Sequence, residues 1–104
     1  MQTAAPSTAE LAALSQACSS LWLATLSLMT AFMTQPAPAH RYLLARRIAR
    51  NFATLREQPE CFSAATLKKF EAMEARWTKK AERLSPVREE PAGVLGRLQR
   101  LLAR

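Results

Sequence analysis

The clearest chemical feature of this 104-residue sequence is a run of basic side chains at helical spacing between residues 63 and 84. At about 100° per residue they fall on an outward arc, with the acidic residues on another flank. Arg76 and Lys80 repel each other across one helical turn, as do Lys79 and Arg83. A bound anion would reduce this repulsion. One interpretation of this pattern is a surface that binds phosphates or an acidic protein. The alternative interpretation is a solvated face that only keeps the protein soluble. The candidates are Lys68, Lys69, Arg76, Lys79, Lys80 and Arg83, together with Arg46, Arg47 and Arg50 upstream.

Cysteine and histidine are too few and too scattered to predict catalysis or metal binding. Cys18 lies in an apolar run and Cys61 in an expected turn, which makes neither a disulfide framework nor a zinc site. His40 is the only histidine, and the sequence has no aspartate and no glycine-rich phosphate loop. The N-terminal residues lack the basic segment of a signal peptide. We therefore expect no enzyme activity, no metal, no cofactor, and reduced thiols in a cytoplasmic protein.

Charge is divided unevenly along the chain, whose formal net charge is +7. Residues 1–39 contain a single charge, Glu10, whereas residues 40–84 carry a net +6 and residues 85–104 a net +2. This asymmetry indicates an anionic partner without choosing among an acidic protein, nucleic acid and lipid headgroups. The preference for arginine over lysine, eleven against four, suggests a GC-rich bacterial genome.

The sequence predicts an all-α fold, an antiparallel three-helix bundle followed by a short amphipathic C-terminal helix. Helix-forming residues dominate long stretches, glycine occurs only twice, and no window alternates apolar and polar residues as a strand would. The expected division is a disordered N-terminus (1–6), three bundle helices (7–34, 38–57 and 63–84), a linker (85–93) and the C-terminal helix (94–104).

Local signals place the ends of these helices. Ser7 and Glu10 have the spacing of a capping box, in which each side chain satisfies a free backbone amide of the first turn. Ser63 is the expected N-cap of the third helix. Pro38 suits the first position of the second helix, because a proline there removes no helical hydrogen bond.

The helix over residues 7–34 carries no charge from Leu11 onward, and two environments fit it. Its apolar side chains cover an arc of roughly 220°, and serine, threonine and glutamine gather opposite. That sorting predicts a bundle helix enclosed by protein on most sides, with its polar edge in water. Residues 11–33 would also reach across a bilayer, and the arginines after Ala39 fit the positive-inside rule. A single-pass membrane protein with a cytoplasmic basic region is therefore one alternative.

Helix lengths suggest self-association. The first helix should span roughly 42 Å and the other two roughly 30 Å each, so the first would project apolar surface beyond them. Either the C-terminal helix (94–104) or the same region of a second copy should cover that surface, and a symmetric dimer is the simplest cover. The self-association candidates are Trp22, Leu26, Met29 and Met33, although the methionines at 29, 33 and 73 also fit a role as core filler.

These patterns predict a small basic helical adaptor or accessory protein that acts by protein–protein interaction, forms a homodimer and binds an acidic protein. The other alternative is a non-specific nucleic-acid-binding protein that uses the basic faces of the second and third helices. No helix-turn-helix supports base recognition, because the connection after residue 57 contains proline and lacks glycine. Phe70 and Trp77 lie in an apolar stripe, so we expect them in the core rather than stacked on bases.

Overall fold

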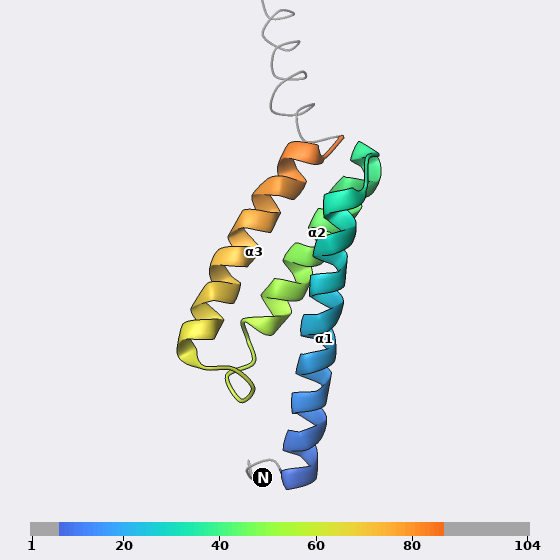
Figure 1. The fold of residues 1–104 in the computed structure, drawn as a ribbon. Helices are drawn as coiled ribbons and strands as arrows, with labels where there is room; N and C mark the ends of the chain where they lie inside the picture. Colours follow the sequence, from blue (N-terminus) through green and yellow to red (C-terminus); the bar gives the residue numbers. More distant parts are fainter. Residues whose placement is uncertain (1–6, 87–104) are drawn as a thin grey trace, which may run out of the picture.

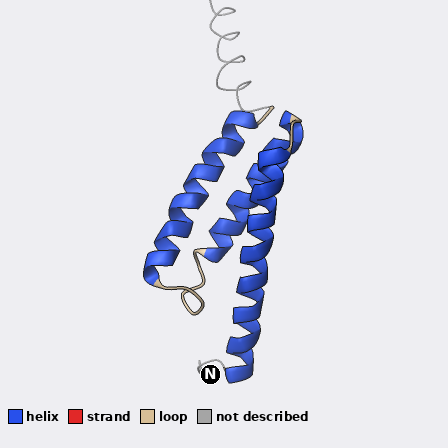
Figure 2. Ribbon diagram, viewed as in Figure 1, coloured by secondary structure: helices blue, strands red, loops and turns tan. Residues whose placement is uncertain are grey.

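The computed structural model describes residues 7–86, which form an all-α three-helix bundle with no strand among them (Figure 1, Figure 2). The helices are α1 (Thr8–Thr34), α2 (Pro38–Leu55) and α3 (Ala64–Leu84). Successive helices run in opposite directions. The predicted fold class is thus confirmed. The N-terminus predicted to be disordered (1–6), most of the linker (85–93) and the predicted C-terminal helix (94–104) lie outside the described residues.

The helices begin where local signals place them. The Ser7 hydroxyl accepts a hydrogen bond from the Glu10 amide at 3.1 Å, and the Glu10 carboxylate accepts one from the Ser7 amide at 2.7 Å. These two bonds complete the predicted capping box. The Ser63 hydroxyl accepts from the Thr66 amide at 3.2 Å and so caps α3. Pro38 is the first residue of α2, as expected.

The C-terminal end of α2 comes slightly earlier than the predicted residue 57. The amides of Glu57 and Gln58 donate to the carbonyls of Thr54 and Leu55 at 3.2 Å, so the chain leaves the helix through tighter turns. Pro59 explains this ending, because a proline disfavours helical geometry in the residue before it. The difference is confined to the last turn and leaves the helix order unchanged.

α2 is the central helix of the bundle. The buried core consists of Ala45, Ile48, Ala49, Phe52 and Leu55 from α2, Phe70, Trp77 and Ala81 from α3, and Phe32 from α1. Phe52 is fully buried between aromatic side chains of both other helices. Its ring centroid lies 5.9 Å from that of Trp22 on α1 and 5.8 Å from that of Phe70 on α3. The prediction that Phe70 and Trp77 belong to the core is correct.

α1 and α3 both lie against α2, but their backbones stay apart. Along the whole described length of these two helices, no Cα atom of one lies within 8 Å of a Cα atom of the other. Aromatic side chains bridge the distance instead. The ring centroids of Trp22 and Phe70 are 5.2 Å apart, and those of Phe32 and Trp77 are 4.9 Å apart. The bundle is therefore more open between α1 and α3 than on its other sides.

α1 is the longest helix, and one narrow stripe of it is buried. Its N-terminal end extends beyond the neighbouring ends of α2 and α3 (Figure 1). Between residues 8 and 17 every side chain is exposed except that of Leu14, which is half-buried. The buried side chains of α1 are Cys18, Thr25 and Phe32, at a spacing of seven residues. The predicted overhang of α1 is present.

The expectation that protein encloses α1 on most sides is wrong for residues 7–86. Of the other two helices, only α2 brings its backbone close to α1, so a single stripe is covered. The polar edge, including Ser20 and Ser27, is exposed as expected. Apolar side chains outside the stripe are exposed as well, by 63% for Leu23, 39% for Leu26 and 78% for Met33. Met33 is consequently not core filler.

Candidate functional site

The nine basic candidates are all exposed, but they are divided among separate surfaces. Arg46, Arg47 and Arg50 lie on α2, and the other six lie on α3. On α3, Lys69 and Arg76 occupy the side toward α1, where they line a hollow together with Trp22. Lys80 and Arg83 continue that stripe at helical spacing, whereas Lys68 and Lys79 fall further from α1. The sequence could not reveal this division, since it depends on how the helices are packed.

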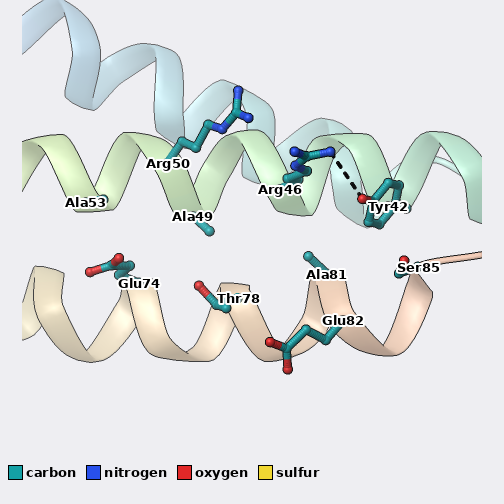
Figure 3. A pocket seen from close by; sticks show the side chains of 10 residues that line it. All are labelled: Tyr42, Arg46, Ala49, Arg50, Ala53, Glu74, Thr78, Ala81, Glu82 and Ser85. Atoms are coloured by element: carbon teal, nitrogen blue, oxygen red, sulfur yellow. Dashed lines mark hydrogen bonds between the residues drawn. The ribbon is translucent and has the colours of Figure 1, made fainter. Parts of the chain in front are cut away.

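The side of the bundle between α2 and α3 mixes both signs of charge. A hollow of about 370 Å³ there is lined by Arg46 and Arg50 from α2 and by Glu74 and Glu82 from α3. Figure 3 shows the two arginines rising from α2 and turned away from α3, with Arg46 donating a hydrogen bond to the Tyr42 hydroxyl at 3.2 Å. Acidic side chains thus separate the basic residues of α2 from those of α3. A continuous track for phosphates is interrupted on this side.

Arg56, which sequence analysis did not single out, connects the end of α2 to α3. Its guanidinium lies 2.5 Å from a carboxylate oxygen of Glu74 and 3.4 Å from one of Glu71. The hydrogen bond that Arg56 donates to the Glu74 carboxylate raises the pKa of Arg56 above its ordinary value. The pairs are solvent-exposed, so they orient the helices more than they stabilise them. Their consequence is that the acidic flank of α3 is turned toward α2 and its basic flank toward α1.

A second hollow, here named the α1–α3 groove, opens on the side where the two backbones stay apart. It has a volume of about 570 Å³ and a mostly apolar lining that includes four aromatic side chains. Phe62, which precedes α3, packs edge-on against Phe70 at 4.9 Å between ring centroids. The lining residues are Trp22, Phe52, Phe62, Thr66, Lys69, Phe70, Ala72, Met73 and Arg76. The groove is therefore an apolar floor with basic side chains on its α3 wall.

The four self-association candidates divide into two pairs. Trp22 and Met29 are half-buried and pack against the core, so the bundle itself already uses much of their surface. Leu26 and Met33 are exposed, and Leu23 lies near them on the same uncharged helix. The three exposed side chains are here called the α1 apolar face. The sequence pattern placed all four candidates on one side of the helix, but only packing shows which of them remain accessible.

The two cysteines, which are far apart in sequence, are brought together in the fold. Both are free thiols, with Cys18 buried and Cys61 half-buried. The Cys61 thiol donates to the carbonyl of Leu14, one turn before Cys18 on α1, at 3.8 Å between sulfur and oxygen. Burial raises the pKa of the Cys18 thiol to about 11, and a hydrogen bond with Cys61 and the charges of Cys61 and Glu60 add to the shift. The sequence did not indicate that the two thiols lie close to each other.

Cys18 is expected to react with iodoacetamide far more slowly than Cys61 in the folded protein. Its raised pKa lowers the reactive thiolate by roughly a hundredfold relative to an ordinary thiol with a pKa of 9.0. Folding favours the neutral form of the Cys18 thiol. The contribution of this preference to stability is fully present at a pH below the pKa of the unfolded chain, 9.0, and is lost as the pH rises through the pKa of the folded protein, about 11. Mass spectrometry of the labelled peptides measures the two rates. In urea both cysteines should react alike, and equal rates without urea would contradict the prediction.

The described residues hold little that resembles a catalytic or metal centre. Within residues 7–86, no group of three or more His, Cys, Asp or Glu side chains is placed to hold a metal ion. His40 is exposed at the start of α2. The surface features of the described residues are the α1 apolar face, the α1–α3 groove and the exposed arginines of α2.

Comparisons with known proteins assign no family to this chain, because no family model, no curated protein and no solved structure matches it. By length and composition alone, α1 would be able to cross a membrane. A helix at the centre of a soluble protein meets the same test, so the distinction depends on how α1 packs.

Proposed function

We propose that this chain is a small basic helical adaptor that acts by protein–protein interaction and associates with itself through the α1 apolar face. The observation that carries the proposal is the exposure of Leu23, Leu26 and Met33 on a helix whose buried stripe is so narrow. Apolar surface gathered on one side of a helix favours burial against another protein. A symmetric dimer covers the same face on both copies at once.

The charge distribution supports a contact between two copies at this helix. α1 contains a single charged side chain, Glu10, although the whole chain carries a formal net charge of +7. Two copies that meet along α1 therefore join uncharged surfaces and keep their basic side chains apart, which limits the repulsion between them. Uncharged serines and threonines beside the leucines also allow close packing without burying a charge.

The membrane alternative has less support from the packing of α1. Trp22 and Phe32, in the apolar part of the helix, contact rings of α2 and α3 at 4.9–5.9 Å. Those two helices carry exposed charges such as Arg47 and Lys80. A bilayer around α1 would either separate it from these rings or draw charged side chains into hydrocarbon, which is costly.

The nucleic-acid alternative has less support from the arrangement of charge. Glu74 and Glu82 lie beside Arg46 and Arg50 on one side of the bundle, so phosphates there would approach carboxylates as well as guanidinium groups. Affinity for nucleic acid depends on tracking many phosphates with few opposing charges.

Sedimentation velocity without detergent tests the proposed self-association. At tens of micromolar we expect a dimer that dissociates on dilution, because the α1 apolar face is smaller than the interface of an obligate dimer. A strict monomer over that concentration range would contradict self-association. A sample that stays in solution only with detergent would instead favour the membrane alternative.

A further inference from the structure

The α1–α3 groove combines an apolar floor with basic groups that lack a counter-charge. Trp22, Phe52 and Phe70 form its aromatic floor, and Lys69 and Arg76 line it from α3. Within residues 7–86 the ion pairs are those of Arg56 with Glu71 and Glu74, so the two basic groups of the groove have no carboxylate partner there. An apolar surface beside unneutralised cations fits a ligand that is apolar on one side and acidic on another.

The shape of the groove fits a helix. Since α1 and α3 both pack on α2 and keep all their Cα atoms more than 8 Å apart, the space between them is where a four-helix bundle would hold its fourth helix. The walls also extend along the helix axes. Leu26 lies one turn after Trp22 on α1, and Lys80 lies one turn after Arg76 on α3. These two positions place a further apolar residue on the α1 side and a further basic residue on the α3 side, one turn beyond the lining of the groove.

We propose that the α1–α3 groove binds an amphipathic helix from a different, acidic protein. The apolar side chains of that helix pack on Trp22 and Phe70, and its carboxylates pair with Lys69 and Arg76. Helices that dock in this way present apolar anchors at intervals of three and four residues. The inference rests on the proposed adaptor function, for which it supplies the partner site and the chemistry of the partner.

Charge argues against the two occupants that this chain could supply itself. A second copy that docked through α1 would present a helix with no charge from Leu11 onward, which offers no carboxylates to pair with Lys69 and Arg76. The segment 94–104 has leucines at helical spacing, but its charged residues are Arg97, Arg100 and Arg104, with no acid. Like charges facing each other across a contact weaken it and suppress wrong partners. An acidic helix is the occupant that both walls favour.

Fluorescence anisotropy with a labelled model peptide tests the groove on the full-length chain. The probe is a helix-forming peptide of about five turns, with leucines on one face and glutamates on both flanks. We expect micromolar binding that weakens roughly tenfold when Lys69→Glu and Arg76→Glu are combined, since two rim charge pairs turn into repulsions. Combining Lys68→Glu with Lys79→Glu makes the same change of charge away from the groove and should leave the affinity within about twofold.

The outcomes separate this inference from the proposed self-association. Equal binding of a peptide with lysines in place of the glutamates, equal loss in both double variants, or absence of binding would overturn the groove proposal. Binding that appears only after residues 94–104 are deleted would identify that segment as the occupant, and loss of peptide binding on dimerisation would identify a second copy. The Lys69→Glu, Arg76→Glu variant should have the same dimer dissociation constant in sedimentation velocity as the unmodified chain. The groove proposal and the self-association proposal can therefore fail independently of each other.

Discussion

Replacing Phe52 with alanine is expected to remove most of the stability of the bundle. Phe52 is fully buried on the central helix and touches Trp22 and Phe70, which belong to the two helices that do not approach each other closely. Loss of a buried phenylalanine costs about 3–5 kcal/mol, through lost transfer energy and the cavity that remains. A domain of this size has a free energy of unfolding of only about 4–12 kcal/mol. Urea unfolding followed by circular dichroism measures the change.

Two further substitutions show whether the effect comes from this position. Phe52→Leu keeps an apolar side chain in the core and should cost clearly less than Phe52→Ala. Leu23→Ala changes an exposed leucine of α1 and should alter the free energy of unfolding by less than about 0.5 kcal/mol. If Phe52→Ala unfolded at the same urea concentration as the unmodified chain, α2 would not be the centre of the bundle.

Combining Leu26→Glu with Met33→Glu is expected to convert the proposed dimer into a monomer. Both side chains are exposed within one copy, by 39% and 78%, so the substitutions should leave the helices themselves intact. In a symmetric dimer each substitution appears twice, and four carboxylates would have to leave water at one contact. We expect the dissociation constant of the dimer to rise at least about a hundredfold. Sedimentation velocity over a dilution series measures it.

Ala24 and Ala31, which are exposed on the opposite side of the same helix from Leu26, provide the matched control. Ala24→Glu with Ala31→Glu introduces the same two charges, at the same spacing of seven residues, at positions roughly 140–160° around the helix from Leu26. This variant should dimerise as the unmodified chain does, and circular dichroism should give the same helix content for both variants. A Leu26→Glu, Met33→Glu protein that still dimerised would place the contact elsewhere and contradict the proposed interface.

The order and the ends of the helices could be predicted because they depend on neighbouring residues. A capping box needs only Ser7 and Glu10, three positions apart, and Pro59 acts on the residue before it. The apolar stripe of α3 has a helical period, so Phe70 and Trp77 could be assigned to the core from their spacing. These signals are contained within single turns or single helices.

The pairing of residues from different helices could not be predicted in the same way. Cys18 and Cys61 stand close together, and Arg56 pairs with Glu74, although each pair is far apart in sequence. Each of these contacts depends on the azimuth and the offset at which one helix packs on another.

By itself the sequence determined that the described chain makes three helices, where they begin and which stripe of α2 and α3 is buried, because capping and amphipathic periods act over one or two turns. The tertiary structure decided that α1 is covered along one side only, that the basic residues are divided between two sides of α3, and that an aromatic groove remains between α1 and α3. The physical reason is that large rings hold those two helices apart. The width of that gap depends on how side chains from all three helices interlock, which no single helical pattern contains.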